Sequence, residues 1–170
     1  MSLFDEYIND DEFLKEISPA HERVLEDVRN LPEFAFIKGD LQRIKGYIQE
    51  LYKLLDQLEL YTRPASAYTR HFTEVYNTIS RIKEYSQIID DIFNKVKRDI
   101  KEVPNYGRFE GYLEIIQMEI PEKIAGLAGI LQHDMSYGYN IAYKLPKFKR
   151  VAREKLEELD LFMDSLISHM

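Results

Sequence analysis

The sequence predicts an all-α fold, an up-and-down antiparallel bundle of four main helices with long coiled-coil-like seams and a short N-terminal helical pair. The chain carries long apolar runs whose members are spaced alternately by three and four positions. Proline and glycine separate these runs, and the breaks are short, as in antiparallel bundles. With 170 residues, 45% of them hydrophobic and 31% charged, the chain fits a single folded domain, residues 1–170.

The longest apolar run lies within residues 65–103 and has one polar interruption, Ser86. It covers about five heptads, and a helix of this length would extend about 50 Å at about 1.5 Å per residue. Such a helix is longer than its neighbours. It is therefore covered by the N-terminal arm, bends near Ser86, or protrudes and pairs with another subunit. The run consists of Tyr68, Phe72, Val75, Ile79, Ile82, Ile89, Phe93, Val96, Ile100 and Val103.

The second half of this run carries the most specific functional prediction. A protruding helix would expose Ile89, Phe93, Val96 and Ile100 as an apolar strip. A strip of that size drives association, because soluble monomers rarely expose large contiguous apolar patches. We therefore expect a homodimer that forms through the helix 65–103, with these four residues in the contact.

Three other segments complete the main bundle, residues 41–170. A helix over residues 41–62 ends before Arg63-Pro64 and should lie antiparallel to the long helix. A third segment, residues 109–131, is interrupted by Pro121, where we expect a kink or a short break. An aromatic loop over residues 136–143 follows, and Pro146 then opens a last helix that continues to the chain end.

Residues 1–40 form an acidic N-terminal helical arm. Ser18-Pro19 is typical of an N-cap followed by the first helical position, so we expect one short helix over residues 3–17 and a second that starts at Pro19. Leu31-Pro32 should end the second helix, and Gly39-Asp40 supplies a break and a cap before the main bundle.

Charge is segregated along the chain. Residues 1–40 hold eleven acidic and four basic side chains, which accounts for the whole net charge of −7. Residues 144–155 hold six basic side chains and one acidic side chain. Either the acidic arm packs against the basic helix, or the basic segment forms a surface for an acidic partner or nucleic acid.

The aromatic loop 136–143 leads directly into the basic segment 144–155. Aromatic rings that stack on bases, next to cations that neutralise phosphates, are what single-stranded nucleic acid requires. Tyrosine is also enriched at protein interfaces, and the chain contains twelve. The same residues are therefore candidates for a protein partner or for nucleic acid: Tyr137, Tyr139, Tyr143, Lys144, Lys147, Lys149, Arg150 and Arg153.

No motif for catalysis, a metal or a cofactor stands out. Cysteine is absent, no Gly-x-Ser-x-Gly or phosphate loop occurs, and none of the four histidines has a Glu three positions earlier, as di-iron bundles require. No apolar run could span a membrane and residues 1–11 lack a secretion signal, so we expect a cytoplasmic protein. The predicted function is a non-enzymatic protein-interaction, scaffold or regulatory bundle. The alternatives are a nucleic-acid-binding accessory subunit and a ligand pocket inside the bundle.

Overall fold

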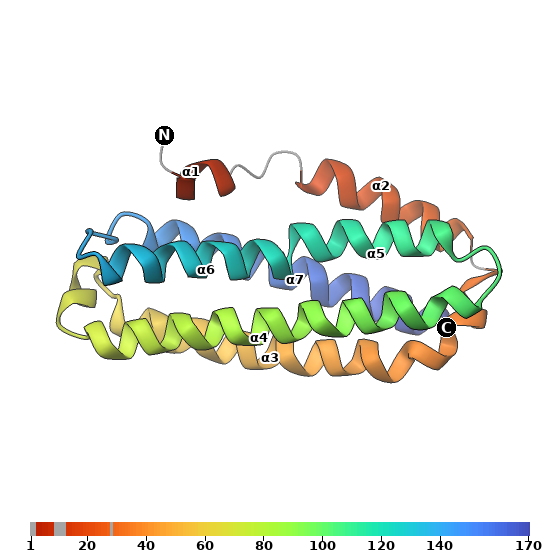
Figure 1. Cartoon of the computed structure of the whole chain (residues 1–170), viewed down its shortest axis with the longest axis horizontal. Helices are drawn as coiled ribbons and strands as arrows, with labels where there is room; N and C mark the ends of the chain where they lie inside the picture. Colours follow the sequence, from red (N-terminus) through yellow and green to blue (C-terminus); the bar gives the residue numbers. More distant parts are fainter. Residues whose placement is uncertain (1–2, 9–12, 28) are drawn as a thin grey trace.

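A computed structural model describes residues 3–8, 13–27 and 29–170, and over these residues the fold is all-α, as the sequence predicts (Figure 1). Four rods form the bundle. They are α3 (Lys38–Tyr61), α4 (Phe72–Asp99), the pair α5 (Gly107–Glu119) and α6 (Pro121–Ser136), and α7 (Leu145–His169). Each rod buries one apolar stripe in a shared core, which is the usual arrangement of amphipathic helices in a bundle.

Ion pairs between α3 and α7 show that these two helices are antiparallel. Near the start of α3, Lys45 pairs with Asp164 near the end of α7. Near the end of α3, Glu59 lies 2.6 Å from the Nζ atom of Lys149, in the second turn of α7. One pair joins the start of α3 to the end of α7, and the other joins the end of α3 to the start of α7. The register between the two helices is therefore held at both ends.

The third rod is broken where Pro121 was predicted to interrupt it. Helix α5 ends at Glu119 and α6 begins at Pro121, while Ile120 between them leaves helical geometry at φ −117° and ψ −80°. Proline cannot donate the hydrogen bond that would continue α5, but it is well suited to the first position of a new helix. The two helices lie end to end along α4 (Figure 1).

Helix α4 is shorter than the run 65–103 predicted. Residues Ala65–Thr69 form a separate 3₁₀ helix, η2, and Ile100–Glu102 form another, η3, so α4 has 28 residues against 24 in α3 and 25 in α7. The α5–α6 pair covers the remaining length on one side. With 28 residues, α4 is only slightly longer than α3 and α7, and the large length mismatch that suggested a protruding end disappears.

The predicted self-association strip is buried within the single chain. Ile89, Phe93, Val96 and Ile100 are each at most 1% exposed and belong to the core shared by the four rods. The expectation that they form an exposed contact for a second copy is therefore wrong. The helical period of the seam correctly predicts that these residues are buried. The helices that bury them, however, are α3 and the α5–α6 pair of the same chain.

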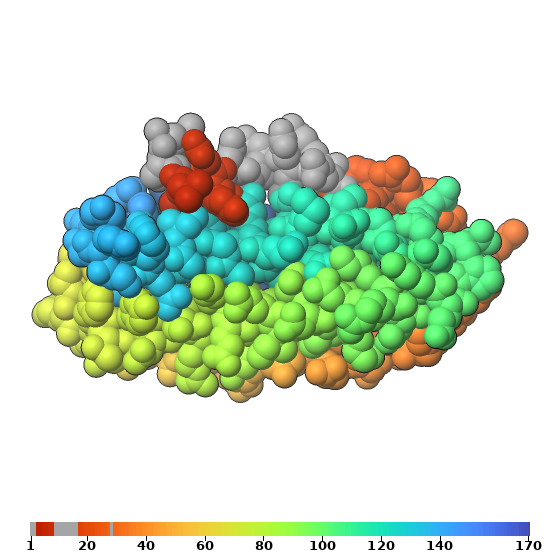
Figure 2. Space-filling model, in the orientation of Figure 1, coloured from red at the N-terminus to blue at the C-terminus, as the bar shows by residue number. Residues whose placement is uncertain are grey.

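The N-terminal arm lies along the outer side of the bundle (Figure 1). It consists of α1 (Leu3–Tyr7), α2 (Phe13–Glu26) and the 3₁₀ helix η1 (Leu31–Ile37). Helix α1 packs on α6, whereas α2 packs mainly on α5. Figure 2 shows α1 seated on the surface of α6. The N-terminal helical pair of the prediction is thus present, but its boundaries differ.

Two predicted helix boundaries in the arm are wrong. Helix α2 continues through Ser18 and Pro19, and α3 begins at Lys38, so that Gly39 and Asp40 lie inside its first turn. Proline in a helix interior loses one hydrogen bond and is tolerated only where packing holds the helix. Pro19 itself is exposed, while the side chain of Val24 is buried in the core. Tertiary packing therefore outweighs the local stop signal.

The acidic arm forms specific contacts with the bundle. Phe4 of α1 is fully buried, and Tyr7 lies so close to Gly126 of α6 that a Cβ atom there would stand 3.3 Å from the tyrosine ring. Asp5 pairs with Lys147 at 3.3 Å, and on the α2 side Asp27 pairs with Arg108 of α5 at 2.6 Å. The acidic arm therefore reaches the basic C-terminal helix through the Asp5 pair, but it packs mainly on α6 and α5.

Candidate interaction surfaces

The connection between α6 and α7 presents three tyrosines to solvent. Tyr137, Tyr139 and Tyr143 are 67%, 59% and 55% exposed, and we call them the aromatic end surface. The ring of Tyr137 stacks on that of Tyr139 with centroids 6.1 Å apart, and it also contacts the ring of His133 with centroids 4.6 Å apart. These contacts hold the rings in place, so part of the ordering cost of binding is met before a partner arrives.

The loop that carries these tyrosines is anchored to the neighbouring connection. The hydroxyl of Tyr68, in η2, donates to Asn140 Oδ1 at 3.5 Å and accepts the N–H of Ile141 at 3.4 Å. Gly138 adopts φ +75°, a conformation that residues with a Cβ rarely take, and so allows the tight turn after α6. The two connections lie at the same end of the bundle (Figure 1).

Most of the basic side chains predicted as a binding surface are engaged within the chain. Carboxylates from α1, α3 and α6 neutralise four of them, so the positive charge of segment 144–155 is largely compensated. Among the residues that the structure describes, Arg150 is the one of these predicted basic residues without a carboxylate in ion-pair distance. The pairs are Lys144 with Asp134, Lys147 with Asp5, Lys149 with Glu59 and Arg153 with Asp56, at 2.5, 3.3, 2.6 and 2.8 Å.

Lys144 is buried and packs between neighbouring helices. Its Nζ atom lies 5.8 Å from the ring centre of Phe4 and 5.5 Å from that of Tyr143, and it donates to Asp134. Burial acts to lower the pKa of Lys144, but the hydrogen bond and the charge of Asp134 outweigh it, so the pKa is raised. Lys144 therefore stays charged and joins α6, α7 and α1 instead of facing a ligand.

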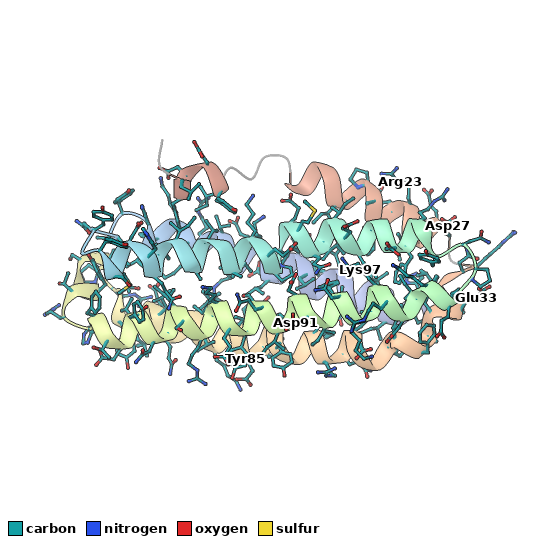
Figure 3. The ribbon with its side chains drawn as sticks, in the orientation of Figure 1. Arg23, Asp27, Glu33, Tyr85, Asp91 and Lys97 are labelled. Atoms are coloured by element: carbon teal, nitrogen blue, oxygen red, sulfur yellow. The ribbon has the colours of Figure 1, made fainter. Side chains whose placement is uncertain are left out.

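A polar groove of about 800 Å³ lies where α5 ends and α6 begins, between α4 and α1. The carboxylates that line the groove come from four different helices. The groove is not predicted from the sequence. The one available signal was a polar stripe on α4, where Asp90, Asn94 and Lys97 follow one another at steps of four and three. Figure 3 shows Lys97 between α4 and the α5–α6 pair. The acidic residues that line the groove are Glu6, Asp90, Glu114, Glu119 and Glu122.

His21 connects α2 to the bundle. Its Nδ1 atom lies 2.5 Å from the hydroxyl of Tyr112 in α5, and its ring packs on Phe162 of α7 with centroids 4.7 Å apart. Burial, followed by the nearby charge of His169, lowers the pKa of His21. Burial also raises the pKa of Tyr112, so the phenol keeps its proton. The contact therefore joins two neutral groups at neutral pH.

Within residues 3–8, 17–27 and 29–170, no group of three or more His, Asp or Glu side chains is arranged to hold a metal ion. None of the described helices is both long and apolar enough to cross a membrane. Comparison of the chain with protein-family profiles, with curated proteins and with solved structures gave no match.

Proposed function

We propose that this protein is a non-enzymatic interaction module, a helical bundle that binds a protein partner through the aromatic end surface. A second copy of the chain is the first partner to test. The observation that carries the proposal is the group of three exposed tyrosines on an anchored loop, two of which, Tyr137 and Tyr139, stack on each other. Tyrosine provides a large contact area at a low cost in conformational entropy and is over-represented among residues that dominate binding energy.

The electrostatics around the aromatic end surface favour a protein partner. The neighbouring cations Lys144 and Lys147 are neutralised by Asp134 and Asp5, so the rings stand next to compensated charge. A polar rim with little net charge around aromatic rings is the usual composition of a protein interface. The rest of the bundle supplies a rigid support for these rings, because the two connections at this end are hydrogen-bonded to each other.

The proposal is tested with the variant Tyr137→Ala/Tyr139→Ala/Tyr143→Ala. Its matched control, Phe36→Ala/Leu161→Ala, removes exposed apolar side chains from η1 and α7. Light scattering over a range of concentrations reports self-association, and calorimetry reports the binding of any purified partner. We expect the tyrosine variant to weaken the association at least about tenfold and the control to leave it unchanged. Equal affinities for the two variants would contradict the proposal.

The nucleic-acid alternative makes a different prediction. It requires binding to a labelled oligonucleotide that weakens steeply with salt and is lost in Lys147→Glu/Arg150→Glu. The internal pairing of four of the five predicted basic side chains is an argument against this alternative. A domain that binds nucleic acid usually carries a net positive charge, whereas this chain has −7. Salt-dependent binding lost in that variant would favour the alternative over the protein interface.

A further inference from the structure

The groove at the α5–α6 break combines negative charge with an apolar side. Glu6 of α1, Asp90 of α4, Glu114 of α5 and Glu122 of α6 line it together with Glu119. Two lysines, Lys97 and Lys123, also line it, and Lys123 lies 3.9 Å from Glu119 of the preceding turn. The carboxylates outnumber the lysines, so the groove has an excess of negative charge.

Gln117 provides a second and independent indication of a ligand. Its side chain is only 3% exposed and lines the groove. The amide nitrogen donates to Asp90 Oδ1 at 2.7 Å and to Asn94 Oδ1 at 2.8 Å. These two acceptors fix the orientation of the amide, because a reversed amide would place its oxygen against a carboxylate.

The amide oxygen of Gln117 consequently has no hydrogen-bond donor among the described residues. Buried polar atoms are nearly always paired, so this unpaired acceptor, on a residue that lines the groove, indicates that a donor is missing close to it. Asp90, which accepts from the same amide, stands next to it in the groove. A cationic N–H group placed at Asp90 would supply a counter-charge and would bring a hydrogen-bond donor close to the Gln117 amide.

The direction of the pKa shift of Glu122 agrees with a shortage of positive charge in the groove. Loss of water raises the pKa of Glu122, and the neighbouring charges of Asp90 and Glu114 raise it further. Lys97 acts in the opposite direction but does not reverse the shift. A bound cation would relieve the repulsion among these three carboxylates.

The surroundings of the carboxylates indicate which class of cation fits. Met118 and Leu3 are exposed beside the groove, and Tyr7 contributes its ring. Apolar surface of this kind accommodates the methylene groups of an alkyl cation. A compact metal ion would instead require converging carboxylates, and no such set of three occurs among the described residues. The volume of about 800 Å³ falls within the range of small-molecule sites.

We propose that this groove binds a linear polyammonium ion, a protonated aliphatic polyamine, with one ammonium group at Asp90 and Gln117 and another at Glu114 and Glu122. The methylene chain between the ammonium groups packs against Met118 and Tyr7. The groove and the aromatic end surface share no residue, so this proposal does not rest on the proposed protein-binding function. Occupancy would connect α4, α5 and α6 at the break before Pro121 and thereby stabilise the bundle.

Spermine is the probe for this proposal. Titration calorimetry of the full chain at low salt should show saturable binding of one spermine, and thermal unfolding should move to a higher temperature as spermine is added. In Glu114→Gln/Glu122→Gln we expect affinity to fall about tenfold or more and the thermal shift to shrink. Mg²⁺ at the same charge concentration should give no saturable binding, because it lacks the alkyl chain.

The matched control is Glu154→Gln/Glu157→Gln, which removes the same charge from exposed positions of α7. It should bind spermine as the unmodified chain does. An equal loss of affinity in both double variants would overturn the proposal, since it would show a diffuse attraction to the acidic protein. Absence of saturable spermine binding would overturn it, and so would saturable Mg²⁺ binding that is lost in Glu114→Gln/Glu122→Gln. Failure of the spermine experiment would not change the result expected for the tyrosine variant that tests the proposed protein interface.

Discussion

Lys144 Nζ lies 2.5 Å from Asp134 Oδ2, and this ion pair joins the start of α7 to the end of α6 beneath Phe4 of α1. The two side chains are 9% and 12% exposed, so neither charge is well hydrated without the other. Removal of one member of such a pair leaves an uncompensated charge in a poorly solvated site. The pair therefore explains how a loop with several exposed tyrosines keeps a fixed position.

The first prediction concerns this ion pair. Lys144→Met should reduce the free energy of unfolding by about 3 kcal/mol, because the carboxylate of Asp134 loses its counter-charge in a largely buried site. The double variant Lys144→Met/Asp134→Leu should recover much of that loss, since no isolated charge remains. Urea denaturation of the unmodified chain, Lys144→Met, Asp134→Leu and the double variant measures the difference. A double variant as unstable as the sum of the two single variants would argue against coupling between these residues.

The second prediction follows from the burial of the seam on α4. Phe93→Ala should lower the free energy of unfolding by about 3–5 kcal/mol, because a fully buried ring is replaced by a cavity. The neighbouring exposed residue gives the control, and Asp91→Ala should change stability by no more than about 0.5 kcal/mol. Denaturant unfolding gives both values, and light scattering gives the molar mass. A change of mass in folded Phe93→Ala, with stability unchanged, would restore this seam as an interface.

The helical period predicts most of the bundle because it depends on local spacing. The break at Pro121 and the aromatic loop are predicted correctly for the same reason, since proline and glycine act through their own backbone geometry. The period does not distinguish a 3₁₀ turn from an α-helix over a few residues, so Tyr68 of η2 is assigned to the long helix. It also predicts that Phe93 is buried without indicating which chain covers it.

The candidate sites depend on contacts that are distant in sequence. Glu6, Asp90 and Glu122 line one groove only because α1 docks on α6 and α6 packs along α4. The basic segment 144–155 is predicted to be a free surface because the carboxylates that neutralise it lie far away along the chain. Glu59, which pairs with Lys149, is 90 residues away. Composition therefore locates the tyrosines and lysines, but tertiary packing decides which of them are exposed.

The third prediction uses two helical glycines that have room for a side chain. A Cβ atom at Gly46 in α3 or at Gly111 in α5 would meet no atom within 4 Å. Alanine at either position should raise the free energy of unfolding by about 0.5–1 kcal/mol, because glycine in a helix interior loses more backbone entropy on folding. The two substitutions lie on different helices and should add. Chemical denaturation of the single and double variants would contradict this expectation if either substitution lowered the midpoint.

The fourth prediction concerns the pH dependence of the contact between His21 and Tyr112. The pKa of His21 in the folded protein lies below its ordinary value of 6.5, so the unfolded chain binds a proton more readily than the native one. Stability should therefore fall as the pH decreases below about 6.5 and continue to fall through the folded pKa. Well above pH 6.5 the histidine is uncharged in both states and this effect vanishes.

The variant His21→Gln isolates this contribution, because it keeps a hydrogen-bonding side chain near the Tyr112 hydroxyl and removes the titration. The loss of stability between pH 7.5 and pH 5 should be smaller in His21→Gln than in the unmodified chain. Urea denaturation at the two pH values provides the comparison. Because His21 holds α2 against α5 and α7, hydrogen exchange at pH 5 should increase first in α2. Slower exchange in α2 than in α3 at that pH would contradict this role of His21.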